Sequence, residues 1–83
     1  MIATLLNAPG CHLCHDMAEV ADPILAAFGV ELREQDVNAD PETRRVYRHE
    51  IPVLLLDGVE IARHRITAAE LQARLEARGL RSA

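Results

Sequence analysis

The residues best suited to chemistry are Cys11 and Cys14, the only two cysteines in 83 residues, with His12 and Leu13 between them. Two thiols at this spacing at the start of a helix can form and break a disulfide with little movement of the backbone. The first sulfur of such a pair lies where backbone N–H groups and the helix dipole favour an anion, so we expect the pKa of the Cys11 thiol to fall. The motif therefore predicts a dithiol redox centre.

Other uses of the same stretch stay open. Cys11, Cys14, His12 and His15 cluster as metal ligands would, although one helical turn does not direct four ligands to one ion without strain. No second ligand-rich segment follows, as structural zinc sites require. A related possibility is an iron–sulfur cluster shared between two subunits. A further alternative is that both cysteines are buried packing residues with no chemical role. The C-x-x-C-H pattern also fits covalent haem attachment, but no export signal is present and there are only two aromatic residues.

His12 is the candidate modulating residue, because it lies between the two cysteines. A protonated His12 would stabilise the Cys11 thiolate, and a neutral one could relay a proton. It could equally be an exposed polar residue of the first helical turn. The pairs His12–Asp16 and His15–Glu19 have i,i+4 spacing, and we expect them to be solvated contacts on the helix surface.

Length, charge and cysteine use narrow the class of protein. The 83 residues predict one small domain, residues 1–83, and we expect a monomer. The net charge of −4 gives no electrostatic reason to bind nucleic acid or anionic membranes. The first seven residues resemble neither a signal peptide nor a membrane span. Because both cysteines belong to one motif and none is left to cross-link the fold, we expect a reducing, cytoplasmic setting.

Short apolar runs alternate with helical periodicity along the chain, which predicts an α/β domain. The expected strands cover residues 2–6, 30–37, 51–56 and 59–63, and the expected helices cover 11–28, 40–48 and 67–79. We expect the second strand to be exposed on one side or at an edge. The apolar face of the first helix is expected at Leu13, Met17, Val20, Ile24 and Phe28.

Local signals mark where these elements begin and end. Pro23 should kink the first helix or start a second helical segment. Asp40 and Pro41 begin the next helix, in which Val46 and Tyr47 are expected to pack. Asp57-Gly58 predicts a type I′ hairpin. Thr67 and Glu70 form a capping box at the start of the last helix.

This order of elements resembles the thioredoxin fold, and in more detail the small glutaredoxin-like proteins of bacteria. The resemblance rests on Gly10-Cys11-His12-Leu13-Cys14, on Ile51-Pro52-Val53 and on the Asp57-Gly58 hairpin. It implies a β-α-β-α-β-β-α order, with a four-stranded mixed sheet and helices on both faces. It implies that Cys11 is the exposed nucleophile and Cys14 the resolving thiol. It also implies a cis Ile51–Pro52 peptide beside them, with the backbone of Ile51 pairing with the substrate.

Two stretches depart from the glutaredoxins that use glutathione. Those proteins carry a Lys shortly before the cysteine pair, where this chain reads Leu6-Asn7-Ala8-Pro9. They carry Gly-Gly and an acid after the last strand, where it reads Arg63-His64-Arg65-Ile66-Thr67. We expect no resident cofactor, and glutathione remains only a possible substrate. The expected partners are a disulfide-bearing protein or small thiol, and an electron donor of the thioredoxin-reductase or glutathione type.

The chain also lacks an acid in its first or third strand that could lie behind Cys14, as thioredoxins have. By sequence, His49 and Glu50 are the nearest candidates. We therefore predict a thiol–disulfide oxidoreductase that uses Cys11 and Cys14, with Ile51 and Pro52 at the substrate. The alternative is a thioredoxin-fold binding module that holds a metal, an iron–sulfur cluster or a protein through the same cysteines without redox turnover.

Overall fold

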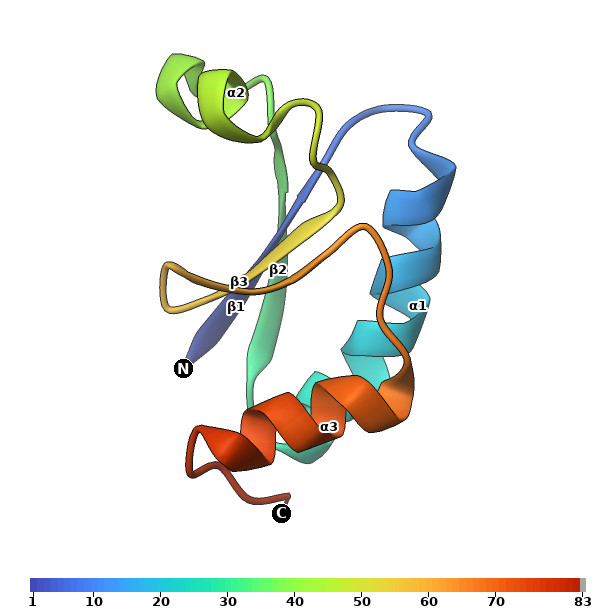
Figure 1. The fold of residues 1–83 in the computed structure, drawn as a ribbon, viewed down its shortest axis with the longest axis vertical. Coiled ribbons are helices and arrows are strands. Elements are labelled where there is room, and N and C mark those ends of the chain that lie inside the picture. The colour runs from blue at the N-terminus through green and yellow to red at the C-terminus, as the bar shows by residue number, and fades with distance from the viewer. Residues whose placement is uncertain (83) are drawn as a thin grey trace.

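The structure is a computed structural model that describes residues 1–82 (Figure 1). A four-stranded mixed sheet carries three helices in the predicted β-α-β-α-β-β-α order, which is the thioredoxin fold. The elements are β1 (Ile2–Asn7), α1 (His12–Ala27), β2 (Glu31–Asp36), α2 (Pro41–Tyr47), β3 (Val53–Leu56), β4 (Val59–Arg63) and α3 (Ala68–Ala77).

The strands lie in the order β2-β1-β3-β4. β1 pairs with β2 in parallel, whereas β1–β3 and β3–β4 are antiparallel. β2 is an edge strand, as its imperfect alternation predicted, and none of its residues is fully buried. The hairpin joining β3 to β4 has positive φ at both Asp57 and Gly58, as a type I′ turn requires.

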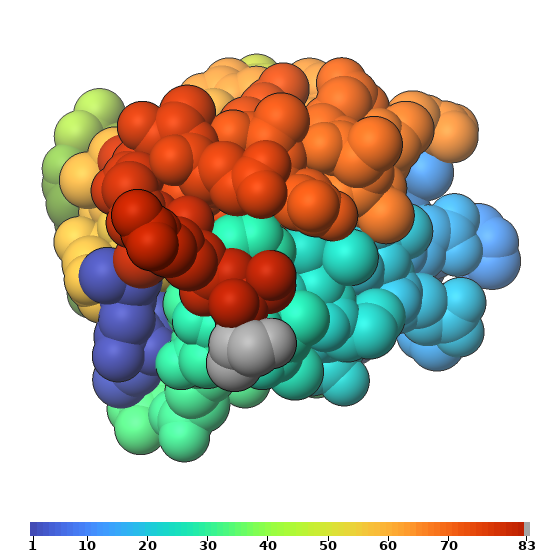
Figure 2. All heavy atoms as spheres, turned by 90° about the horizontal axis from the view of Figure 1, so that it is seen from below, coloured from blue at the N-terminus to red at the C-terminus, as the bar shows by residue number. Residues whose placement is uncertain are grey.

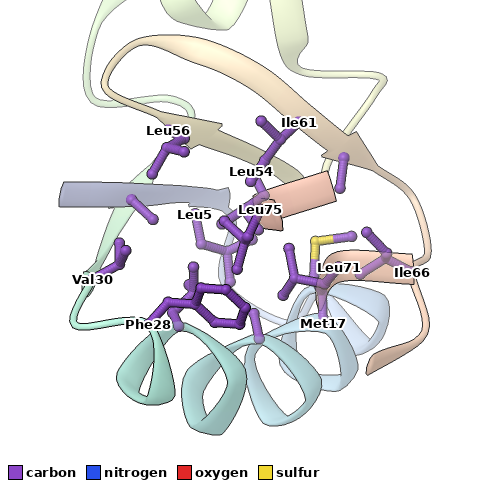
Figure 3. Packing of buried hydrophobic residues seen from close by; sticks show 14 residues of the cluster. Leu5, Met17, Phe28, Val30, Leu54, Leu56, Ile61, Ile66, Leu71 and Leu75 are labelled. Atoms are coloured by element: carbon purple, nitrogen blue, oxygen red, sulfur yellow. The ribbon is translucent and has the colours of Figure 1, made fainter. Parts of the chain in front are cut away.

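The main core lies between one face of the sheet and helices α1 and α3 (Figure 3). Leu5 of β1, Leu54 of β3 and Leu71 and Leu75 of α3 are fully buried there. α3 crosses α1 near the C-terminal end of α1 (Figure 1), and the two helices are neighbours in the view from below (Figure 2). The Thr67–Glu70 capping box that begins α3 is present in both directions, as predicted.

The buried stripe of α1 is shifted by about one residue from the predicted face. Its buried residues are Cys14, Met17, Ala21 and Leu25, while Leu13, Val20 and Ile24 are only partly buried. Small side chains at positions 14 and 21 let the helix approach the sheet, a signal that counting large apolar residues misses. Pro23 lies inside one continuous helix rather than dividing it.

Helix α2 contributes little to the core. It lies on the opposite side of the sheet from α1 (Figure 1), and none of its residues is buried. Val46 is 47% exposed, so the expectation that it packs the helix is wrong. The helix begins as predicted, with the Asp40 carboxylate accepting the Thr43 N–H and Pro41 in the first turn. Local capping, rather than burial, therefore defines α2.

Candidate redox site

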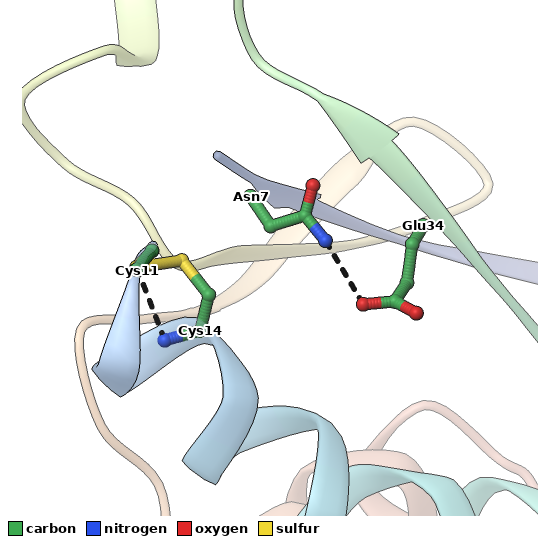
Figure 4. Close-up of a disulfide and its surroundings, with 4 residues drawn as sticks. All are labelled: Asn7, Cys11, Cys14 and Glu34. Carbon is green, nitrogen blue, oxygen red and sulfur yellow. Dashed lines mark hydrogen bonds between the residues drawn. A yellow bond between two sulfur atoms is a disulfide. The ribbon is translucent and has the colours of Figure 1, made fainter. Parts of the chain in front are cut away.

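Cys11 and Cys14 form a disulfide at the start of α1, with their Cα atoms 5.2 Å apart (Figure 4). Cys11 is the N-cap of the helix, and its Sγ accepts the backbone N–H of Cys14 at 3.2 Å. Gly10, with φ of 77°, turns the chain from the loop after β1 into this position. The first sulfur thus occupies the predicted place at a helix N-terminus, where a thiolate is stabilised.

The two sulfurs differ in their access to solvent. Cys14 is 3% exposed, whereas Cys11 is only half-buried. A reactant arriving from outside therefore meets Cys11 first. Cys14 lies on the buried stripe of α1, bonded to Cys11.

Pro52 lies at the same end of the sheet as the disulfide loop. In the antiparallel register Val53 is opposite Leu6, which puts Pro52 beside the end of β1. Pro52 is buried, and the Ile51–Pro52 peptide bond is cis, as the resemblance implied. The Pro52 carbonyl accepts the backbone N–H of His64 at 2.8 Å, which ties this segment to the end of β4.

A cluster of charged groups lies where β4 ends. Glu50 Oε2 lies 3.1 Å from Arg63 Nη1 and 3.0 Å from His64 Nε2. Arg63 also donates two hydrogen bonds to Glu60. These bonds raise the pKa of the Arg63 guanidinium and lower the pKa of the Glu60 carboxyl. Glu50, a candidate for the acid behind Cys14, is thus engaged with β4 instead.

Next to this cluster, a hollow of about 500 Å³ separates α1 from the loop between β4 and α3. Leu13 lines it from the cysteine motif, opposite His64 and Arg65. His64, which was expected to be an ordinary surface residue, is half-exposed but also lines this hollow.

A second hollow, of about 390 Å³, lies on the β2 side of the disulfide. Both cysteines line it, together with Asn7 and Glu34. Asn7 Nδ2 donates a hydrogen bond of 2.9 Å to Glu34 Oε1 (Figure 4). Sequence reasoning missed Glu34 because it searched for an acid in the first and third strands. The available signal was the parallel β1–β2 pairing, which brings the ends of both strands to one sheet edge.

The histidines of the motif lie on the helix surface. The His12 side chain is 87% exposed, with Nε2 3.9 Å from an Asp16 carboxylate oxygen. His15 Nε2 lies 3.0 Å from Glu19 Oε1, and both side chains are exposed. The predicted solvated i,i+4 pairs are therefore present. His12 also lines the hollow of the disulfide, and its modulating role stays a prediction.

Within residues 1–82, no group of three or more His, Cys, Asp or Glu side chains is arranged to hold a metal ion. No helix in this part of the chain is long and apolar enough to cross a membrane.

The fold and the cysteine pair define a thioredoxin-fold protein with a redox-type site. A family model, the Glutaredoxin-like domain, matches residues 3–76. The chain therefore belongs to this glutaredoxin-like family, as its motifs indicated. A comparison with curated proteins finds no significant match.

Solved structures agree with the fold. The structural-genomics target protein XcR50 from X. campestris is 25% identical, with a TM-score of 0.64 over 90% of this chain and 96% of its own. Thioredoxin 1 from Thermosipho africanus is 19% identical, with a TM-score of 0.67 over 94% and 93% of the two chains. Thioredoxin-2 of a malaria parasite, 20% identical, also gives 0.67, over 92% and 81%.

Proposed function

We propose that this protein is a dithiol–disulfide oxidoreductase in which Cys11 attacks a substrate disulfide and Cys14 resolves the product. One observation carries the proposal: Cys11 caps α1 with its sulfur on a backbone N–H and is open to solvent, while Cys14 is buried behind it. A thiolate at the first position and a shielded thiol at the second are what sequential exchange needs.

Substrate recognition is assigned to the segment before β3. Ile51 is half-buried at the sheet end that carries the disulfide loop, so its backbone can pair with an extended stretch of a partner protein. Pro52 offers no N–H and is held through its carbonyl by His64. The proposed partner is accordingly a disulfide-bearing protein or a small thiol, and the proposed setting is the reducing cytoplasm.

The proposed electron donor is a thioredoxin-reductase-type protein or glutathione. A glutathione carboxylate would need a free cation at the site. Arg63 is hydrogen-bonded to Glu60 and paired with Glu50, and Arg45 is paired with Glu42. Arg65, which lines the hollow beside Leu13, is therefore the cation proposed to meet such a carboxylate. Equilibrating the cysteine pair against glutathione and against a thioredoxin–reductase couple would identify the donor and give the reduction potential.

Two cysteine variants test the function. Cys11→Ser should abolish reduction of a test disulfide, because the open nucleophile is lost. Cys14→Ser should form a mixed disulfide with the substrate that is not resolved, visible as an added mass. If Cys14→Ser turns over dithiols as fast as the parent, the roles are wrong. A parent that binds stoichiometric metal or cluster and performs no exchange would instead be the binding module.

A further inference from the structure

The hydrogen-bonded pair of Asn7 and Glu34 lies beside the disulfide and has no role in the exchange steps proposed above. The two residues come from neighbouring strands, β1 and β2, and join at 2.9 Å (Figure 4). Both line the hollow of about 390 Å³ that also exposes Cys11 and Cys14. Asn7 is half-buried and Glu34 is exposed, so the pair lies at the surface of this hollow.

Cys14 has a chemical need that such a pair would meet. The nucleophile in disulfide exchange is the thiolate, and an apolar environment disfavours it. Cys14 is 3% exposed and lies on the buried stripe of α1. Its own backbone N–H is donated to Cys11 Sγ and cannot stabilise a second anion. To attack the mixed disulfide, Cys14 must therefore pass its proton to an acceptor nearby.

Three titratable side chains line the hollow of the disulfide, namely His12, His15 and Glu34. His15 Nε2 is paired with Glu19 at 3.0 Å, and His12 Nε2 lies 3.9 Å from the Asp16 carboxylate on the helix surface. Glu34 is also exposed, but its carboxylate is held at the hollow by Asn7. Asn7 occupies only Oε1 of Glu34 and leaves Oε2 to accept a proton.

The charged groups of α1 that face Glu34 belong to a neighbouring hollow of about 630 Å³. Glu19 and Asp22 line that hollow with Glu34, and neither lines the one with the cysteines. Glu34 is the carboxylate common to both spaces. It is therefore the one acid on this side of the described chain that shares a hollow with both sulfurs.

We infer that Glu34, oriented by Asn7, is the proton acceptor for Cys14 in the resolving step; this inference rests on the proposed function. In the first step the Cys11 thiolate forms a bond to one sulfur of the substrate disulfide and releases the other as a thiolate. In the second, the Cys14 proton moves to Glu34 through water in the hollow. Cys14 Sγ then bonds to Cys11 Sγ, and the second substrate thiolate leaves with the electron pair of the broken bond.

Protons and electrons balance over the two steps. The cysteine dithiol is oxidised by two electrons, and the substrate disulfide is reduced to two thiolates. One thiolate takes up the proton that leaves Cys14, and the other stays ionised or takes from solvent the proton that Cys11 released when it ionised. Glu34 passes the proton that it accepted to the departing thiolate or to water, and so returns to the carboxylate. No further reactant is required.

The test is a single turnover of the reduced protein with a chromogenic aromatic disulfide, followed by stopped flow across pH. The first coloured thiolate reports attack by Cys11, and the second reports resolution by Cys14. Glu34→Gln should leave the first phase unchanged and slow the second by about 10²-fold at neutral pH, the lower end for a positioned base. The difference should close above the ordinary thiol pKa of about 8.5, where Cys14 ionises without help.

Matched variants separate this role from a structural one. Glu34→Asp should restore part of the second phase, and Asn7→Ala should slow it less than Glu34→Gln does. Glu31→Gln, the same change on the same exposed strand but outside the hollow, should leave both phases unchanged. Urea unfolding of each variant checks that the fold is intact.

The outcomes distinguish the two proposals. A parent protein that releases no second thiolate overturns the proposed function itself. A parent with both phases, combined with a Glu34→Gln variant whose second phase matches the parent at every pH, overturns the role of Glu34 alone. Equal slowing of both phases would also overturn it, because a proton acceptor for Cys14 does not act on Cys11.

Discussion

The two sides of the disulfide use their charged groups in different ways. On the β4 side, Glu50 is shared by Arg63 and His64, and Arg63 is also held by Glu60. On the β2 side, Glu34 has one hydrogen bond, to the neutral amide of Asn7. Both sides border the cysteine motif, one through the hollow at Leu13 and the other through the hollow at Cys11 and Cys14.

We infer from this difference that the β4 side stabilises the fold, whereas the β2 side takes part in the reaction. Charges on the β4 side neutralise one another and join the segment before β3 to the end of β4, next to the backbone bond from His64 to Pro52. Such a network fixes the position of Ile51. The carboxylate on the β2 side lines the same hollow as the two cysteines, and Asn7 occupies only one of its oxygens, so we expect catalytic effects there and stability effects on the β4 side.

The largest expected effect comes from a residue on which both sides depend. Leu54 of β3 is fully buried in the core between the sheet and the helices (Figure 3). Leu54→Ala should lower the free energy of unfolding by about 2–5 kcal/mol, because it removes apolar contacts and leaves a cavity. Urea unfolding measures the loss.

Leu55→Ala is the matched control on the same strand. Leu55 points to the opposite face of the sheet and is only half-buried, so it should cost clearly less than Leu54→Ala. Equal losses would mean that the face away from α1 and α3 is as well packed as the core face. Both faces of the sheet would then stabilise the region around the disulfide, and not only the face covered by α1 and α3.

The sequence predicted well the features that local chemistry decides. The hairpin at Asp57-Gly58, the capping box at Thr67 and the N-cap at Cys11 each depend on neighbouring residues, and each is present. The order of the elements and the edge position of β2 followed from apolar periodicity. These features position the cysteine pair, which is why the redox motif and its scaffold could be recognised together.

Features that depend on pairing between distant segments were less accessible. Asn7 and Glu34 are 27 residues apart, and only the β1–β2 register joins them. His49 and Glu50 are the candidates nearest to Pro52 in sequence. The partners of Glu50, however, lie 13 and 14 residues further along, at the end of β4 and just after it. Val46 looked like a packing residue, but the position of α2 leaves it exposed.

A smaller effect is expected from breaking the charged cluster on the β4 side. Glu50→Gln removes the shared carboxylate while Arg63 keeps its two bonds to Glu60. Because these side chains are partly exposed to solvent, the free energy of unfolding should fall by less than about 1 kcal/mol. Urea unfolding gives this value, and the pH profile of the resolving phase should stay that of the parent.

The comparison would be reversed by one particular result. If Glu50→Gln slowed the resolving phase more at neutral than at alkaline pH, while Glu34→Gln did not, the proton acceptor would lie on the β4 side. The β4 side would then take part in the reaction, and the β2 side would not.

The smallest expected effect is an acid dependence of stability that arises mainly on the β4–α3 side. Hydrogen bonds from Arg63 hold the pKa of Glu60 below its ordinary value of 4.5, and the Thr67 N–H and hydroxyl interactions do the same for Glu70. Because these pKa values are lower in the folded than in the unfolded state, the unfolded chain binds more protons in acid. The free energy of unfolding should therefore be level near neutral pH and fall as the pH drops through 4.5 and below.

Urea unfolding as a function of pH measures this slope in the parent and in a Glu60→Gln, Glu70→Gln double variant. The variant should lose stability less steeply in acid, since two of the carboxyls with lowered pKa are gone. The remaining slope is assigned partly to Asp40, whose pKa is lowered by the N–H and hydroxyl of Thr43 at the start of α2. A double variant whose acid slope equals that of the parent would show that the β4–α3 carboxylates do not stabilise the fold, and that side would lose its assigned role as support.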